Sequence, residues 1–411
     1  MNDQTLATGR NRPELVVILA GVCAALHVAK LSPALPVLRE SLGVTLLQAG
    51  FLLSLVQLAG MLLGLGVGLV ADGIGLKRSM LAGLLVLSLA SAAGGWAPDP
   101  ATLLAWRAVE GLGFLLVCMP APALIRRLVA PAHMKTTLGW WGAYMPFGTA
   151  VALLLGPMVL GTTSWQNWWL LLAGLSAIMA AWLWRAVPQD RVYAYAHGLG
   201  ATTRIDGAWL SRLRRTVSSR GPWLVAMAFA LYSGQWLAVI GFLPSVVAHD
   251  GAVGLAMAAP LALAAMVNTV GNIASGRLLQ RGVPAHRLLY VGYCAMGIGA
   301  LVAFASFPGL QGSAVATGLR YSGVLLFSMV GGLIPGTLFS LAVVLAPDEA
   351  SVSTTVGWMQ QWSAMGQFAG PPLVALVAGI VGGWQWTWLI TGTCSILGLL
   401  VASQVARPMV R

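Results

Sequence analysis

Charged side chains are scarce in this 411-residue sequence. They make up 8% of it, against 58% for hydrophobic residues. A water-soluble domain usually carries about a quarter charged residues, so this chain lacks the polar surface that a soluble protein of its size needs. The scarcity excludes a soluble enzyme and indicates a protein whose surface lies largely in lipid.

Several chemical signatures are also missing. The four cysteines all fall inside apolar runs, and no two have the CxxC spacing of a metal or redox site. No G-x-x-x-x-G-K-[ST] loop is present, so we expect no ATP-driven transport within this chain. No His, Asp and Glu residues cluster with catalytic spacing. We expect no catalytic residues, no metal and no cofactor, and therefore a protein that is not an enzyme.

The net charge is strongly positive, at +12, with 23 Lys and Arg against 11 Asp and Glu. These charges lie between apolar runs and form no basic face interleaved with aromatic residues, so we expect no nucleic-acid partner. Their distribution instead fits the loops of a membrane protein.

What the sequence does contain is long apolar runs. A run of about 20 apolar residues crosses a bilayer as a helix, because a helix satisfies its backbone hydrogen bonds internally. We predict an all-α membrane protein with twelve transmembrane helices, at 14–38, 46–70, 79–96, 101–124, 137–160, 168–186, 222–248, 252–279, 288–307, 318–346, 353–380 and 386–406.

The two halves of the sequence repeat each other. The pattern TTLGW at 136–140 recurs as TTVGW at 354–358, and the Gly-Pro pair at 156–157 recurs at 370–371. Internal repeats of this kind are typical of transporters that bind their solute between two halves. We predict three parts: an N-terminal six-helix half at 1–186, a cytoplasmic linker at 187–221 and a C-terminal six-helix half at 222–411.

The basic residues also predict an orientation. If both termini are cytoplasmic, nearly all loop Lys and Arg residues lie on that side, and the opposite side has Arg39, with Arg107 and Arg320 near helix starts. The excess of Arg over Lys is typical of a GC-rich bacterial genome. We therefore expect a multi-pass protein of the bacterial inner membrane with both termini in the cytoplasm.

The turn after the second run reads GLVADGIGLKR at 68–78. It resembles the signature loop of the major facilitator superfamily, G-x-x-x-D-[RK]-x-G-[RK]-[RK], although Gly73 and Leu76 replace two of its basic residues. The resemblance implies the major facilitator fold of two six-helix repeats. It also implies a gating loop at Gly68, Asp72, Gly75, Lys77 and Arg78, with Asp72 pairing with Arg126 or Arg127. The alternative is an ordinary turn that carries cytoplasmic charges.

Two further stretches carry the resemblance. RAVEGLG at 107–113 is similar to the family element R-x-x-[QE]-G-x-G, whose arginine and its neighbour serve proton or substrate coupling. Lys30, together with QW at 235–236 and GFLP at 241–244, is most similar to the cyanate and nitroimidazole porters and related small-anion carriers. Those porters usually have arginine in the first span. Gly148, Gly156-Pro157 and Gly161 match the antiporter branch only in part.

Four ionisable residues fall inside predicted spans, where a charge costs at least about 2.5–3.5 kcal/mol. At a rise of 1.5 Å per residue, Lys30 lies about 12 Å from the outer end of its span, and Arg107 and Glu110 lie about 10 and 15 Å from the same side. His27 precedes Lys30 by three residues and shares its face. We expect these side chains to lie at similar depth on the first and fourth spans.

We interpret this group as an anion pocket in which Lys30, together with Arg107 or Arg320, attracts a solute and Glu110 or His27 carries a proton. The alternative is a static ion pair that fixes helix packing. The remaining candidate substrate-binding residues are His27, Gln235, Trp236, Arg320, Gln360 and Gln361. The tryptophans that flank spans are interpreted as interfacial belt residues; they are Trp96, Trp165, Trp168, Trp169 and Trp384.

These observations predict a monomeric secondary active transporter of a small solute, working by alternating access with membrane lipids around it. We expect a small anion or organic acid as the substrate, carried in symport with protons. The alternative is a proton-coupled efflux antiporter for drugs or hydrophobic metabolites. A transporter-like sensor is a third possibility that the sequence leaves open.

Overall fold

The computed structural model describes residues 12–189, 208–249, 255–306 and 314–406, and all regular structure in these ranges is helical. The first group of helices comprises α1 (Pro13–Ala29), α2 (Leu31–Leu42), α3 (Leu46–Ser54), η1 (Leu55–Gln57), α4 (Leu58–Ile74), α5 (Leu76–Gly94), α6 (Pro100–Cys118), α7 (Ala121–Leu128), α8 (Pro131–Gly142), α9 (Tyr144–Thr162) and α10 (Trp165–Ala186). The second group comprises α12 (Ala208–Ser218), α13 (Arg220–His249), η2 (Leu255–Met257), α14 (Ala258–Met266), α15 (Asn268–Gln280), α16 (Ala285–Phe304), α17 (Ala314–Gly331), α18 (Leu333–Val344), η3 (Glu349–Ser351), α19 (Val352–Val381) and α20 (Thr387–Ala406).

The described helices contain twelve segments that are long and apolar enough to cross a membrane. This confirms the predicted all-α membrane fold. Several segments are broken in two, because a bend divides the helix near the middle of the span. The first span is the pair α1 and α2, the fourth is α6 and α7, and the tenth is α17 and α18.

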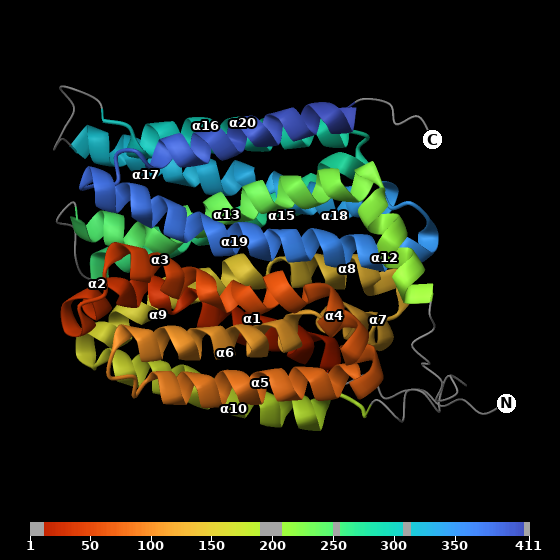
Figure 1. Ribbon diagram of the computed structural model, residues 1–411, viewed down its shortest axis with the longest axis horizontal. Coiled ribbons are helices and arrows are strands. Elements are labelled where there is room, and N and C mark those ends of the chain that lie inside the picture. Colours follow the sequence, from red (N-terminus) through yellow and green to blue (C-terminus); the bar gives the residue numbers. More distant parts are fainter. Residues whose placement is uncertain (1–11, 190–207, 250–254, 307–313, 407–411) are drawn as a thin grey trace.

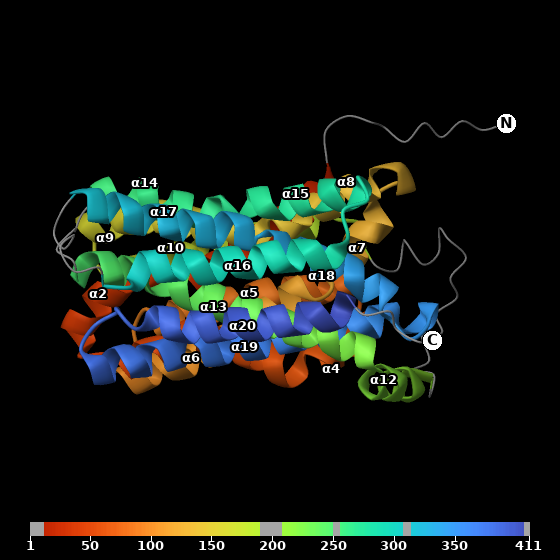
Figure 2. The same ribbon diagram turned by 90° about the horizontal axis from the view of Figure 1, so that it is seen from above.

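The spans run roughly parallel, with the first group on one side of the molecule and the second group on the other (Figure 1). The α2 and α3 helices lie at one end of the bundle, here named the α2 end. The α7 and α12 helices lie at the opposite end, named the α12 end, as the perpendicular view also shows (Figure 2). The division into domains at residues 186 and 221 stays a prediction.

The two groups meet along a seam of closely packed helices. In this seam α3 and α4 pack on α19, α2 packs on α13, and α9 packs closely on α14 but only slightly on α15. Small residues allow the approach: a Cβ on Gly50 would lie 2.8 Å from the Cα of Pro372, and one on Gly60 would lie 3.0 Å from the Cβ of Ala364. The amide of Gln361 donates across the seam to the Met61 carbonyl at 2.8 Å.

The break between α1 and α2 falls at Lys30. Pro33 follows three residues later, and its missing N–H removes one hydrogen bond of the helical ladder. The Lys30 carbonyl accepts a hydrogen bond from the indole Nε1 of Trp168 on α10 at 3.1 Å. The break therefore lies next to α10, and it places the Lys30 side chain inside the first group.

The predicted linker contains one described helix, α12, while residues 190–207 lie outside the described ranges. α12 lies across the end of the bundle (Figure 1). The Arg215 guanidinium forms an ion pair with Asp348 at 2.6 Å, which ties α12 to the segment before α19. This part of the linker is thus packed against the second group.

Candidate functional site

Four predicted site residues come together inside the first group of helices. Lys30 Nζ and Arg107 Nη1 each donate to Glu110, Lys30 to Oε1 and Arg107 to Oε2. His27 Nδ1 lies 3.8 Å from Oε1 of the same carboxylate. All four side chains have no solvent-accessible surface. We name Lys30, Arg107, Glu110 and His27 the charge cluster.

Lys30 points away from the seam, toward α5 and α10. Its ammonium donates to the Ser91 hydroxyl at 2.8 Å and lies 4.6 Å from the ring centroid of Trp169, a cation–π distance. The Ser91 hydroxyl in turn donates to the Trp169 carbonyl at 2.9 Å. The ammonium thus has a carboxylate, a hydroxyl and an aromatic face as neighbours.

The expectation that the flanking tryptophans form an interfacial belt is wrong for four of the five. Trp168 and Trp169 are fully buried and help enclose Lys30, and Trp165 and Trp384 are also buried. Only Trp96 is largely exposed, at 72%. A buried indole N–H usually finds an acceptor, and for Trp168 that acceptor is the Lys30 carbonyl at the helix break.

Arg107 is held mainly by backbone carbonyls. Its Nε donates to the Leu52 carbonyl at 3.0 Å, and its Nη1 donates to the His27 carbonyl at 2.7 Å. These bonds connect α6 with α3 and α1. Because a guanidinium has five N–H donors and no acceptor, it suits a place where several carbonyls and one carboxylate converge.

His27 connects the charge cluster to α10. Its Nε2 lies 2.7 Å from the Ser176 hydroxyl, which is 3.4 Å from the Cys23 thiol. The other ring nitrogen, Nδ1, is buried without a hydrogen-bond partner and lies on the Glu110 side. A histidine in this position has a proton site available toward the carboxylate.

The charge cluster carries an excess positive charge. Lys30 and Arg107 contribute two cations, Glu110 contributes one anion, and neutral His27 contributes none, which leaves a formal charge of +1. A buried net charge is costly in the low dielectric of a membrane protein. Such an arrangement is suited to accept an anion.

The remaining substrate candidates do not join the charge cluster. Gln235 and Trp236 lie inside the second group, where Gln235 accepts from Ser395 at 3.2 Å and Trp236 donates to Ser328 at 3.2 Å. Gln361 lies on the seam, and its amide oxygen is buried without a partner. Gln360 on α19 and Arg320 on α17 are half-buried at separate places.

The predicted gating loop is described only in part. Gly68 and Asp72 belong to α4, but the Asp72 side chain lies outside the described residues, and so does its predicted pairing with Arg126 or Arg127. Gly75 separates α4 from α5 with φ +107°, a conformation that favours glycine. Lys77 is buried and donates to the carbonyls of Trp184 and Val187, and Arg78 is exposed. Lys77 therefore fastens α5 to the end of α10.

Sequence reasoning missed four contacts of the charge cluster, made by Ser91, Ser176, Trp168 and Trp169. The serines gave a usable signal, because a hydroxyl inside an apolar span usually bonds to a neighbouring helix. In the described part of the chain, no three His, Cys, Asp or Glu side chains are grouped closely enough to bind a metal ion.

Comparison with known proteins decides the family. The profile of the Major Facilitator Superfamily matches residues 17–371. The chain belongs to the major facilitator superfamily. It is therefore a secondary transporter with a small-molecule substrate, and not an enzyme, as predicted.

Two solved members share its fold. The Escherichia coli xylose transporter XylE has a TM-score of 0.72 at 12% identity, covering 96% of this chain and 97% of that chain. A bacterial homolog of the lysosomal transporter Spinster has a TM-score of 0.76 at 14% identity, covering 96% of each chain.

Relatives of known activity fall into two classes. The 2-nitroimidazole transporter of Escherichia coli is 27% identical over 98% of this chain and 97% of its own length. The cyanate transport protein CynX of the same species is 24% identical over 94% and 95%. The puromycin resistance protein pur8 of Streptomyces alboniger is 32% identical over 75% of this chain, which spans 58% of that relative. The resemblance to the porters is thus confirmed, and the substrate is unresolved between small anions and drugs.

Proposed function

We propose that this major facilitator transporter carries a small anion or organic acid together with protons, by alternating access. The observation that supports it is the charge cluster, in which two cations share one carboxylate in a fully buried site. The similarity to a cyanate transport protein over nearly the full length supports the same substrate class, since cyanate is a small anion.

The formal charge of the cluster explains how proton binding and anion binding are coupled. At rest the cluster has a formal charge of +1, and a proton on Glu110 raises it to +2 and weakens the hold on Lys30. A monovalent anion beside Lys30 and Arg107 then returns the charge to +1. Binding one proton with one monovalent anion therefore leaves the buried charge unchanged, which avoids the cost of burying a second net charge. The proposal is a symport of one proton with each monovalent anion.

Access is part of the proposal, because the charge cluster is closed in the conformation described. The solute has to enter from the seam, and the Lys30 ammonium, which points away from the seam toward α5 and α10, has to turn toward it. Release of Lys30 from Glu110 is the step that frees its ammonium for an incoming anion. His27, with Nδ1 directed at the carboxylate, is the proposed neighbour that exchanges the proton.

The topology proposed with this function is the predicted one. Both termini face the cytoplasm of a bacterial cell, the membrane is the inner membrane, and the two six-helix halves at 1–186 and 222–411 rock about the seam as a monomer. The basic residues of α12 support this orientation, since α12 lies at one end of the bundle (Figure 1). Lys77 and Arg78 at the start of α5 add two further positive charges in a turn between spans. Labelling of an introduced exposed cysteine from one side of inverted vesicles tests it.

The transport test uses purified protein in proteoliposomes with an imposed pH gradient. A panel of monovalent anions and short organic acids is offered, with proton movement followed by an internal pH dye. We expect uptake of at least one anion with one proton each, and its loss in Lys30→Gln. The matched control is Arg39→Gln, because Arg39 is an exposed cation at the α2 end. Normal transport by Lys30→Gln, or no anion carried at all, refutes the proposal.

A second candidate is proton-coupled drug efflux. Its support is the 32% identity to the puromycin resistance protein and the 31% identity to the methylenomycin A resistance protein of Streptomyces coelicolor. Growth of cells expressing the protein in a drug panel distinguishes the two candidates. Resistance that disappears in Glu110→Gln, together with absent anion uptake by the native protein, favours efflux.

A further inference from the structure

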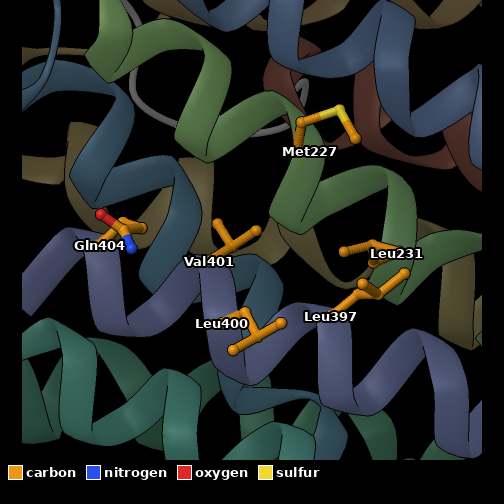
Figure 3. A pocket seen from close by; sticks show the side chains of 6 residues that line it. All are labelled: Met227, Leu231, Leu397, Leu400, Val401 and Gln404. Carbon is orange, nitrogen blue, oxygen red and sulfur yellow. The ribbon is translucent and has the colours of Figure 1, made fainter.

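An apolar groove lies on the outer surface of the second group, between α13 and α20. It is lined by Met227 and Leu231 of α13 and by Leu397, Leu400 and Val401 of α20, with Gln404 at one end. Figure 3 shows these side chains from two neighbouring helices facing the same gap. Leu400 is 58% exposed and Leu397 is 45% exposed, so the groove is open to the surrounding lipid.

The groove ends in a polar group at the α12 end. Gln404 accepts a hydrogen bond from Nη2 of Arg220, the first residue of α13, and Arg220 is otherwise exposed. A guanidinium has five N–H donors. Arg220 uses one of its nitrogens, Nη2, to bond to the side-chain oxygen of Gln404. Because Arg220 is exposed, its other donors are accessible to a partner from outside the protein.

More positive charge lies next to Arg220. The segment from 208 to 220 contains Arg212, Arg214, Arg215 and Arg220 and no acidic residue. Arg215 is paired with Asp348, whereas Arg214 is exposed on the free side of α12, close to the exposed Leu210 and Val217 in helical spacing. An exposed face that combines arginine with apolar residues is typical of helices at an anionic membrane surface.

We propose that the groove and Arg220 together bind one anionic phospholipid. One acyl chain lies along Met227, Leu231, Leu397 and Leu400, and the phosphate accepts hydrogen bonds from the Arg220 guanidinium. Arginine pairs with phosphate through two parallel N–H donors, which gives this contact its strength. The site is distinct from the charge cluster, which lies in the other group of helices.

The dimensions fit this occupant. Met227 and Leu231 lie seven and eleven residues from Arg220, or about 10 and 16 Å at 1.5 Å per residue. The hydrocarbon of one leaflet is about 15 Å thick, half of a 30 Å core, so a chain that starts at Arg220 ends near Leu231. The groove volume of about 270 Å³ lies below the range of roughly 300–1,000 Å³ that holds drug-sized ligands. It suits a single flexible chain better than a compact solute.

The experiment is native mass spectrometry of the full-length protein, delipidated in detergent and titrated with dioleoylphosphatidylglycerol or dioleoylphosphatidylcholine. Both lipids carry a phosphate, but the choline cation of phosphatidylcholine offsets the phosphate charge that Arg220 binds. We therefore expect the first phosphatidylglycerol to bind about tenfold more tightly than phosphatidylcholine. In Arg220→Gln this preference disappears. In Leu400→Trp the indole fills the groove, so the first lipid of either kind binds more weakly.

Matched controls separate the site from general lipid adhesion. Arg39→Gln removes an exposed cation at the α2 end, and Leu389→Trp enlarges a residue on α20 that is 48% exposed and lies outside the groove. Both should behave as the native protein. Equal binding of the two lipids by the native protein, or an unchanged preference in Arg220→Gln, overturns the proposal. Displacement of the lipid by an equal concentration of glycerol 3-phosphate also overturns it, because the acyl chain would then contribute nothing.

Discussion

Lys30 at the end of α1 donates a hydrogen bond to Glu110, which lies 80 residues later on α6, and both side chains are fully buried. The contact joins two spans that are not consecutive in the chain. Arg107 shares the same carboxylate, so the three side chains form one electrostatic unit. Its formal charge of +1 determines how the unit responds when one member is neutralised.

The first prediction concerns the stability of charge variants. Glu110→Gln leaves two buried cations without a counterion, whereas Lys30→Gln leaves a neutral pair of Arg107 and Glu110. Loss of the only anion should therefore destabilise by about 3–5 kcal/mol, the usual effect of breaking a buried ion pair. We expect the thermal midpoint in detergent to fall much further for Glu110→Gln than for Lys30→Gln. Equal midpoints would show that the excess positive charge has no energetic effect.

The second prediction concerns the indole bond to the helix break. Trp168→Phe removes the donor to the Lys30 carbonyl, and because phenyl is smaller than indole it also leaves a cavity in this fully buried place. The matched control is Trp169→Phe on the same helix, since Trp169 is equally buried and its indole nitrogen has no hydrogen-bond partner. The missing bond should make Trp168→Phe less stable than this control by about 0.5–1.5 kcal/mol. Thermal unfolding of both variants measures the difference, and identical midpoints would contradict a role for this bond.

The third prediction concerns the seam between the two groups. Gly50 on α3 faces backbone atoms of Pro371 and Pro372 on α19, which have no freedom to move aside. Overpacking of this kind costs about 1–3 kcal/mol, so Gly50→Val should force α3 away from α19 and slow transport. Gly66→Val on α4 is the control, since a Cβ there meets nothing within 4 Å. Uptake rates at matched protein levels compare the two. Equal uptake rates for the two variants would show that the close packing of α3 on α19 at Gly50 is not needed for transport.

The fourth prediction concerns pH. Asp99 precedes α6 and accepts hydrogen bonds from the Thr102 backbone N–H at 2.9 Å and from the Thr102 hydroxyl at 2.8 Å. These bonds, the backbone one first, hold the pKa of Asp99 below its ordinary value in the folded protein. The stabilisation is therefore complete above the unfolded-state pKa and is lost as the pH falls through the lower folded-state pKa. The change of stability with pH is therefore confined to acidic solution, and the stabilisation itself is present at neutral pH.

Asp99→Asn tests this sign, because asparagine also caps helices but does not titrate. The native protein should have the higher thermal midpoint at pH 6–7, about two or more units above the ordinary aspartate pKa of about 4. The two midpoints should approach each other as the pH is lowered below that value. A difference that stays constant with pH would assign the effect to something other than the carboxylate charge.

The sequence predicted a large part of the charge cluster. Counting residues from the outer ends of two spans placed Lys30, Arg107 and Glu110 at similar depth, and the structure joins them. The direction in which Lys30 points was not predictable from that count. In lipid both faces of a helix are apolar, so the hydrophobic pattern does not separate the face that packs on protein from the face that meets lipid.

The same physical limit explains the errors around Trp168 and Trp169. Tryptophan near the start of a span is equally compatible with an interface and with a buried contact. Here the Lys30 ammonium and the Lys30 carbonyl decide in favour of burial. Gln235 and Trp236 are similar, because their polar atoms bond within the second group instead of facing a solute. For each of these residues, contacts with other helices determine whether the side chain is buried. A single sequence does not show which residues on other helices make those contacts.

The helix break at Lys30 divides the first span into parts with different neighbours. α1 packs among the helices of its own group, whereas α2 has α13 of the other group as its largest single neighbour and also packs on α9 and α3 of its own group. The α2 part of the span therefore contacts both halves of the molecule, while the α1 part stays with its own half. When the halves move relative to each other, α2 is pulled from both sides, and a bend at the existing break would act directly on the residue whose ammonium holds Glu110.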